Sequence, residues 1–381
     1  MDVKQILTNA QVVTKDEVFL GTVVVEHGSI VAIDQGLSQV PGGIDCQGDI
    51  LIPGLVELHT DNLEKYFTPR PGVDWPSRSA VLTHDAQIVA SGITTVFDAL
   101  SLGDINQGRE RLRNLQDMVD ALNEAEQQSV HRANHYLHLR CEVSYADVLG
   151  LFESLLDHPM VHLVSVMDHS PGQRQFVKEE KYREYYQGKF GMTTEELDNF
   201  IARQKAASAL YSDQYRAQIV ARCKERAIPV ASHDDATVEH VQESANYGMR
   251  IAEFPTTMAA ARLSHENGLS VLMGAPNIVR GGSHSGNIAA SELAREGVLD
   301  ILSSDYYPSS LLEGAFRLRH EENAYDLPKA IQTVTSTPAE CAGLADRGEI
   351  AIGKRADLVW VREHQNHPLI QHVWNGGKRV F

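Results

Sequence analysis

The sequence has few cysteines, and they are not arranged as a disulfide framework or a thiolate metal site. Among 381 residues there are four, Cys46, Cys141, Cys223 and Cys341, and no two of them form a Cys-x-x-Cys pair. A small disulfide-stabilised fold and a cysteine-ligated zinc site are therefore excluded. We expect four reduced thiols, most of them buried.

Long apolar runs are also absent. No stretch approaches the roughly 20 apolar residues that a membrane-spanning helix needs. The first residues, MDVKQILTNAQVV, lack the apolar core of a signal peptide. These observations predict a cytoplasmic protein that does not contact a membrane.

The sequence has fewer basic residues than acidic ones. The chain has 34 lysines and arginines against 51 aspartates and glutamates, which gives a formal net charge of -17 at pH 7. The basic residues are scattered and form no tracts, so a general nucleic-acid binder is excluded. A local group of arginines can still bind a small anion. The phosphate-binding patterns GxGxxG, after the first strand, and GxxxxGK[ST] are missing.

The middle of the chain, residues 54–345, alternates short β-rich runs with helical stretches. This pattern predicts the α/β class with a parallel sheet. Eight such units favour a (β/α)8 TIM-type barrel over a doubly wound sheet. The predicted strands are 55–59, 93–98, 136–142, 161–167, 228–232, 249–254, 269–273 and 299–304.

The two ends of the chain have a different character. Both alternate apolar and polar positions in short runs between glycine-rich turns. We predict one small β-sandwich domain built from residues 1–53 and 346–381. The segment 174–226 is longer than a barrel crossover requires and is predicted to be a helical insertion, serving as a lid or as a contact in a homo-oligomer.

Polar residues gather where the predicted barrel strands end. Parallel barrel strands are buried on both faces, and their carboxyl ends together form the active-site face. Nearly every predicted strand ends in a carboxylate or an imidazole. These residues are His59, Asp61, Asp98, Glu142, Asp168, His169, His233, Asp234, Asp235, Glu253 and Asp305.

Such a ring of carboxylates needs a cation, because converging carboxylates repel one another and raise one another's pKa values. Histidine and carboxylate ligands without cysteine suit zinc, manganese or iron, and a bridging glutamate suits two metal ions. A bound divalent metal lowers the pKa of its water, so the implied chemistry is hydrolysis. The predicted ligands are His59, Asp61, Glu142 as the bridge, His169, His233 and Asp305, with Glu253 as an alternative.

A single histidine at a strand end is more commonly a satisfied polar residue than a ligand. The combination of His-x-Asp on strand one, a histidine on strand five and an aspartate on strand eight points to metal, because these residues converge only in a barrel. Asp98 is instead predicted to orient a neighbouring histidine.

A second set of residues is basic. Arginines and lysines in the loops around metal ligands suit phosphate oxygens, through bidentate guanidinium bonds and backbone N–H donors. We therefore predict a polyanionic, phosphorylated small-molecule substrate. Its predicted contacts are Lys65, Arg70, Arg140, Arg174, Asn277 and Arg280.

With these residues in view, the sequence resembles the amidohydrolase superfamily of metal-dependent hydrolases. The segments LIPGLVELHTD, VASHDDAT and LSSDYYP carry the resemblance. Longer segments, among them MDHSPGQRQF and MGAPNIVRGGSHSGN, resemble the diphosphatases of the C-P lyase pathway of phosphonate degradation. That resemblance implies hydrolysis of a ribose-linked triphosphate between its alpha and beta phosphorus atoms, with Asp305 orienting the water and accepting its proton.

The sequence departs from the superfamily pattern in two places. The first strand usually ends in His-x-His, whereas here it ends in His59-Thr60-Asp61. Strand six usually supplies a histidine, whereas here it ends in Glu253. Either Glu253 or His169 therefore completes the ligand set, and the metal preference can differ from that of the superfamily.

Two other functions fit parts of the pattern. Relatives of this superfamily hydrolyse cyclic amides or N-acyl bonds, and the basic residues would then hold a carboxylate or one phosphate. A barrel that has lost its chemistry can also serve as a binding or assembly protein. Such a protein would have no physical need for a full set of strand-end ligands.

Overall fold

The computed structural model describes residues 4–103, 110–176, 179–283, 286–320 and 325–381. Residues 1–3 of the predicted terminal domain and 177–178 of the predicted insertion lie outside this range. The strands are β1 Gln5–Val13, β2 Val18–Glu26, β3 Ser29–Gln35, β4 Ile44–Asp45, β5 Ile50–Pro53, β6 Leu55–Thr60, β7 Ile93–Leu102, β8 Asn134–Glu142, β9 Val161–Met167, β10 Val230–His233, β11 Ile251–Glu253, β12 Ser270–Gly274, β13 Ile301–Ser303, β14 Leu358–His364, β15 His367–Asn375 and β16 Lys378–Arg379. The helices are α1 Asn62–Phe67, α2 Ser77–Ala90, α3 Glu110–Arg113, α4 Leu115–Gln127, α5 Val148–Leu155, the 3-10 helix η1 Arg174–Phe176, α6 Glu179–Phe190, α7 Thr194–Glu225, α8 Val238–Asn246, α9 Met258–Glu266, α10 Ala275–Arg280, α11 Ala290–Arg295, α12 Ser310–His320, α13 Leu327–Gln332 and α14 Ser336–Cys341.

The eight strands β6 to β13 form one sheet in the order of the sequence. Neighbouring strands pair in parallel, for example β6 with β7 and β10 with β11. The two ends of this order, β6 and β13, meet through a parallel bridge between Thr60 and Asp305. The sheet is therefore a nearly closed barrel, and the predicted (β/α)8 architecture is confirmed.

The barrel strands form where the sequence is continuously apolar and β-branched. All six residues of β6 and all ten of β7 are buried. Strands covered on both faces lose the polar alternation of a half-exposed strand. The eight predicted strands coincide with β6 to β13, with differences only at their ends, such as the four further residues 99–102 in β7.

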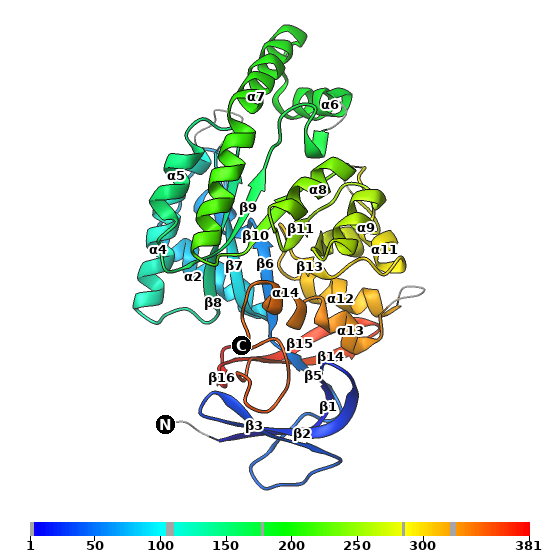
Figure 1. Ribbon diagram of the computed structural model, residues 1–381. Coiled ribbons are helices and arrows are strands. Elements are labelled where there is room, and N and C mark those ends of the chain that lie inside the picture. The colour runs from blue at the N-terminus through cyan, green and yellow to red at the C-terminus, as the bar shows by residue number, and fades with distance from the viewer. Residues whose placement is uncertain (1–3, 104–109, 177–178, 284–285, 321–324) are drawn as a thin grey trace. The chain divides into compact units, whose positions relative to one another are not determined.

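A second, mixed sheet joins the two ends of the chain. Its order is β16-β15-β14-β5-β1-β2-β3, and β4 pairs with β1. The N-terminal and C-terminal parts meet where β5 runs antiparallel to β14. Figure 1 shows this sheet in blue and red. The predicted β-structure from both termini is confirmed as one connected sheet.

The core of this sheet is apolar and draws on both ends of the chain. Leu7, Val23 and Ile30 pack with Leu358 and Trp374. The indole N–H of Trp374 donates a hydrogen bond of 2.8 Å to the side-chain oxygen of Gln5. Neither terminal segment alone can bury these faces, so they fold together.

By compactness the chain divides into two units. The first consists of residues 1–98, 120–136 and 273–381, and the second of residues 99–119 and 137–272. The first holds the mixed sheet together with β6 and β13. The second holds β8 to β11 and the helices of residues 174–226. The two sheets divide the chain differently: the mixed sheet takes its strands from the two ends, and the barrel sheet takes its strands from the middle. We therefore retain the predicted division into residues 1–53 with 346–381, and residues 54–345, as a proposal.

The segment 174–226 contains η1, α6 and the 32-residue helix α7. Thr193 begins α7 with a capping box, because its hydroxyl accepts from the Glu196 amide and the Glu196 carboxylate accepts from the Thr193 amide. Figure 1 shows α6 beside α7. Tyr182, Tyr186 and Phe200 form the aromatic core between them.

Among the described residues, no helix combines the length and apolar character needed to cross a membrane. All four cysteines are free thiols, and three of them are buried. Burial raises the pKa of the Cys46 and Cys223 thiols to about 12, so both are neutral at physiological pH.

Candidate active site

The first group of candidate ligands comes from the ends of β6 and β13. His59, Asp61 and Asp305 each offer a ligand atom, and these atoms lie within 4.8 Å of one another. His59 is buried, whereas Asp61 and Asp305 are half-buried. The Nε2 atom of His59 is 3.9 Å from Oδ1 of Asp61. One imidazole and two carboxylates at this spacing are a donor set suited to a divalent cation.

Backbone hydrogen bonds hold this group in place. The amide of Asp61 donates to the carbonyl of Asp305 at 2.9 Å, and the amide of Asp305 donates to the carbonyl of His59 at 3.1 Å. Asp305 adopts a left-handed backbone conformation with φ of 55°. Such a conformation costs an ordinary residue free energy and is concentrated at functional sites.

Glu57 is a buried residue that the strand-end reasoning missed. Its carboxylate accepts from the His59 amide at 2.7 Å and from the Ser304 amide at 2.5 Å. Burial raises the pKa of the Glu57 carboxyl to about 7. Glu57 therefore links the end of β6 to the end of β13 through two hydrogen bonds. One is to the amide of the candidate ligand His59, and the other is to the residue that precedes Asp305.

Asp98 orients histidines, as its predicted role requires. Its two carboxylate oxygens contact His84 Nε2 at 2.6 Å and His135 Nδ1 at 2.7 Å. The side-chain Nδ2 of Asn62 is 3.3 Å from His84 Nδ1, to which it donates a hydrogen bond. Because Asn62 follows Asp61 in the chain, this buried network fixes the start of α1.

The same network continues to Asp85, which accepts from the amides of Arg132 and Ala133. Burial alone would lower the pKa of His135, but the carboxylates of Asp98 and Asp85 outweigh it and raise this pKa to about 9. Conversely, burial alone would raise the pKa of Asp98, but His135 and His84 hold it well below its usual range. The network therefore contains a buried cation held by two carboxylates.

The second group of candidate ligands belongs to β8, β9 and β10. Ligand atoms of His169, His233 and Asp234 lie within 4.8 Å of one another. Nε2 of each histidine is 3.6 Å from Oδ2 of Asp234. Glu142 contacts His169 Nδ1 at 2.7 Å. Asp234, which was noted at its strand end but not predicted as a ligand, is thus part of this group.

Electrostatics at His169 indicate a site with affinity for a cation. Burial alone would lower the pKa of this imidazole, but Glu142 and Asp234 outweigh it and raise the pKa to about 10. The two carboxylates therefore create a strongly negative potential at the ring. A divalent metal ion suits the same potential, so this donor set fits the metal that the sequence predicts.

Glu253 contacts the ring of His233. Its Oε2 atom is 3.1 Å from His233 Nδ1. His233 Nε2 is then the ring nitrogen directed at Asp234. A carboxylate on the second nitrogen of a metal-binding histidine fixes the tautomer and the ring orientation.

Four of the predicted substrate contacts lie in the first unit. Lys65 on α1 donates to the carbonyl of Tyr306 and lies 5.5 Å from the centre of its ring. Arg70 and Arg280 are exposed. Asn277 accepts a hydrogen bond from the amide of Ala290 at 3.0 Å.

The other two predicted contacts lie in the second unit, and both are buried. Arg140 on β8 is close enough to His233 and Asp234 to lower the pKa of each. Arg174 donates to the carboxylates of Asp235 and Glu243. Arg174 lies in the loop after β9, as the sequence predicts, and the loop turns its guanidinium toward α8.

The fold and these groups define the class of protein. Residues 86–381 match the model of the amidohydrolase family, so the chain belongs to that family. It is also 54% identical, over 377 residues, to the alpha-D-ribose 1-methylphosphonate 5-triphosphate diphosphatase of Escherichia coli (strain K12). This similarity covers 99% of the chain and 100% of that protein.

Solved structures with the same fold are much less similar in sequence. The 5-methylcytosine deaminase from Klebsiella pneumoniae gives a TM-score of 0.65 at 16% identity, covering 99% of this chain and 98% of that one. The dihydropyrimidinase from Brevibacillus agri NCHU1002 gives 0.59 at 12% identity, covering 99% and 95%. At these identities the likeness establishes the fold alone.

Proposed function

We propose that this protein hydrolyses alpha-D-ribose 1-methylphosphonate 5-triphosphate to alpha-D-ribose 1-methylphosphonate 5-phosphate and pyrophosphate, as a step in phosphonate catabolism. The observation that carries the proposal is the 54% identity to the Escherichia coli diphosphatase over nearly the whole of both chains. The two groups of candidate ligands support it, because each combines imidazole and carboxylate donors.

The proposed cofactor is a pair of divalent metal ions, zinc first, with manganese or iron as alternatives. The proposed ligands are His59, Asp61 and Asp305 in the first group and His169 and His233 in the second. Glu142, which contacts His169 Nδ1, remains the proposed bridge between the two ions. When bound, such ions polarise phosphoryl oxygens and lower the pKa of a bound water. Of the two alternatives for the last ligand, we favour His169, because its Nε2 atom faces Asp234 beside that of His233.

Asp305 is the proposed proton acceptor. It is half-buried, and its backbone is fixed against β6 by two hydrogen bonds. A carboxylate held in this way orients a water molecule for in-line attack on phosphorus and accepts its proton. Lys65, Arg70, Arg140, Asn277 and Arg280 are the proposed contacts of the phosphate chain, where bidentate and charge-assisted bonds offset its negative charge.

Hydrolysis of a cyclic amide or N-acyl bond is the alternative within the same family. The high identity to a diphosphatase argues against it. Phosphorus NMR separates the two. Incubation with the ribose triphosphate should produce pyrophosphate and the 5-phosphate in equal amounts, whereas release of an amine from an acylated substrate without any pyrophosphate would support the alternative.

The proposed setting is the cytoplasm, with a phosphorylated small molecule as the partner and no nucleic acid or membrane. The scattered basic residues and the net charge of -17 support the proposal that nucleic acid is not a partner. A homo-oligomer is compatible with the helices of residues 174–226, and sedimentation or light scattering of the purified protein measures the state directly.

A further inference from the structure

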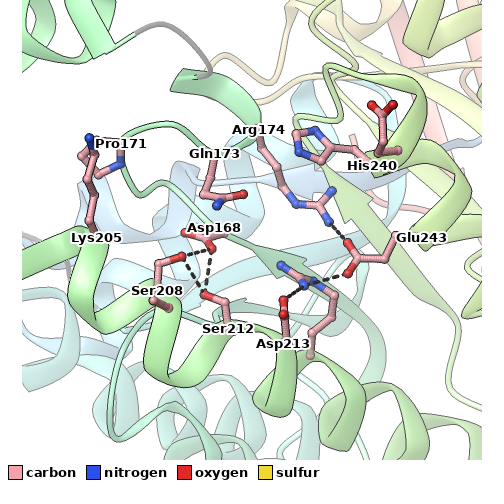
Figure 2. A pocket seen from close by; sticks show the side chains of 13 residues that line it. Asp168, Pro171, Gln173, Arg174, Lys205, Ser208, Ser212, Asp213, His240 and Glu243 are labelled. Atoms are coloured by element: carbon pink, nitrogen blue, oxygen red, sulfur yellow. Dashed lines mark hydrogen bonds and ion pairs between the residues drawn. The ribbon is translucent and has the colours of Figure 1, made fainter.

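A pocket of about 530 Å³ lies in the second unit, between the loop after β9 and the helices α7 and α8. None of the proposed metal ligands lines it. The loop contributes Gln173 and Arg174, α7 contributes Lys205 and Arg216, and α8 contributes Glu243, among others. Figure 2 shows Arg174 and Glu243 facing each other in this pocket.

The two arginines of the pocket are both buried. Arg174 is 2% exposed and Arg216 is 4% exposed. Glu243 bridges them, accepting from Arg174 Nη2 at 2.8 Å and from Arg216 Nη1 at 2.9 Å. Each guanidinium has one further carboxylate partner, which is Asp235 for Arg174 and Asp213 for Arg216. Glu243 is therefore the carboxylate that the two arginines share.

Arg216 also carries a donor that is not used. Its buried Nε–H group has no hydrogen-bond partner among the described residues. A buried donor without a partner destabilises the folded state. A ligand with several acceptor oxygens would remove that destabilisation while contacting the atoms that Glu243 now holds.

Other groups in the pocket are compatible with an anion. Burial and the two arginines lower the pKa of His240 to about 4, so positive potential reaches this ring and it is neutral at pH 7. The carboxylate of Asp168 is already satisfied by the hydroxyls of Ser208 and Ser212 and by the amide of Ser170. The side chain of Asp213 is 98% exposed and can turn toward solvent.

We propose that this pocket is an oxyanion site that binds inorganic phosphate or pyrophosphate between Arg174 and Arg216, and that Glu243 occupies the site until the anion displaces it. The Glu243 side chain is 33% exposed, so it can rotate into water once an anion takes over its hydrogen bonds to the two arginines. A phosphate group offers more acceptor oxygens than a carboxylate and matches the guanidinium fork.

The site also adjoins the second group of candidate ligands. Arg174 Nη1 donates to Asp235, the residue that follows Asp234. The proposal does not rest on the proposed function, because the arginines, the glutamate and the pocket are independent of the metal and of the reaction. If the phosphorus NMR experiment fails, the anion site still stands, and the reverse also holds.

Calorimetric titration with inorganic phosphate, and separately with pyrophosphate, tests the site in the purified enzyme with its metal. Glu243→Gln should tighten phosphate binding, because the competing charge is lost, and Arg216→Lys should weaken it, each by about tenfold or more. The matched control is Glu313→Gln, which removes another partly exposed glutamate that bonds an arginine, Arg317. The control should leave phosphate binding unchanged.

Circular dichroism shows whether each variant is folded. Crystals of the unchanged protein soaked in selenate give a test that does not depend on any variant, since selenium scatters anomalously. A selenium peak between Arg174 and Arg216 supports the site. Its absence, or phosphate affinity unchanged in both folded variants, overturns the proposal.

A kinetic measurement distinguishes a free anion from the phosphate chain of the substrate. If the KM for the ribose triphosphate is unchanged in Glu243→Gln while the phosphate Kd falls, the pocket serves free phosphate or pyrophosphate. If KM falls together with that Kd, the pocket receives the phosphate chain of the substrate. Either result requires an oxyanion site at these two arginines.

Discussion

At the scale of single residues, the strand ends carry the most unusual backbone of the barrel. Asp234, Phe254 and Asp305 follow β10, β11 and β13, and all three have positive φ values between 53° and 57°. Each also donates its amide to a neighbouring strand, as Asp234 does to the carbonyl of Glu253 at 2.8 Å. The surrounding hydrogen bonds therefore sustain a conformation that isolated residues rarely adopt.

Glu57 should act as a positioning residue. Glu57→Gln replaces one carboxylate oxygen with an amide that cannot accept from the His59 or the Ser304 amide, so the ends of β6 and β13 should shift. We expect metal affinity or turnover to fall by about 10- to 100-fold. Metal titration and kcat measure the effect. Glu64→Gln, on α1, is the control, and equal behaviour of the two variants would rule the role out.

Asp305 should act in turnover rather than in substrate binding. Asp305→Asn keeps the size of the side chain but removes the proton acceptor, so kcat should fall by roughly 10²-fold or more with little change in substrate affinity. Steady-state kinetics together with metal analysis of the variant test this. Near-normal turnover would exclude Asp305 as the acceptor.

Arg280 should contact the phosphate chain. It is exposed in the last turn of α10, so Arg280→Ala should leave the fold intact and raise KM, by about tenfold for one lost charge-assisted bond. Arg295→Ala, at an exposed arginine in the last turn of α11, is the matched control. If KM and kcat of Arg280→Ala equal those of the control, Arg280 does not touch the substrate.

At the scale of elements, the Asp98 network couples α1, α2, β7 and β8 through buried charges. The folded state raises the pKa of His135 from 6.5 to about 9, so its contribution to stability is full below pH 6.5 and is lost as the pH rises through about 9. The loss is on the order of 3 kcal/mol. The melting temperature should therefore fall between pH 6.5 and pH 9.

His135→Gln tests this assignment, because glutamine keeps a hydrogen bond but does not titrate. The variant should melt at a lower temperature near pH 6.5 and should lose less stability between pH 6.5 and pH 9 than the unchanged protein. Scanning calorimetry over this range makes the comparison. If the melting temperatures of the two proteins fall in parallel with pH, a group other than His135 titrates over this range.

The barrel strands could be predicted from the sequence, because strands buried on both faces are continuously apolar. Their polar ends were visible for the same reason: in HTD, HDD and SSD the polarity changes abruptly at the strand end. The sequence also predicted that Asp98 orients a histidine. It could not identify His84 and His135 as the partners, because they are distant in sequence and only the packing of α2 against the strands brings them together.

The surroundings of Arg174 could not be predicted either. Its loop contains Pro171 and Gly172, and nothing local indicates that the guanidinium turns toward Asp235 and Glu243. Glu57 was missed for a different reason: it lies inside a buried strand, and its second partner, the Ser304 amide, is distant in the chain. Both cases depend on hydrogen bonds between residues that are far apart in the chain.

At the scale of the whole molecule, the ends of the chain fold together. The sheet of both termini is joined by β5 and β14, and β5 leads into the first barrel strand with only Gly54 between them. An added side chain at Gly54 would clash with the side chains of Thr94 and Asp357, so a glycine is required there. The terminal sheet is therefore attached directly to the strand that carries His59.

The central claim is that the strand-end imidazoles and carboxylates hold divalent metal ions on which hydrolysis of the triphosphate depends. Elemental analysis of the purified protein, with pyrophosphate release measured before and after chelation and metal return, tests it most directly. We predict about two divalent ions per chain, loss of activity on chelation and recovery on metal return. Full activity in a protein free of divalent metal would contradict the account.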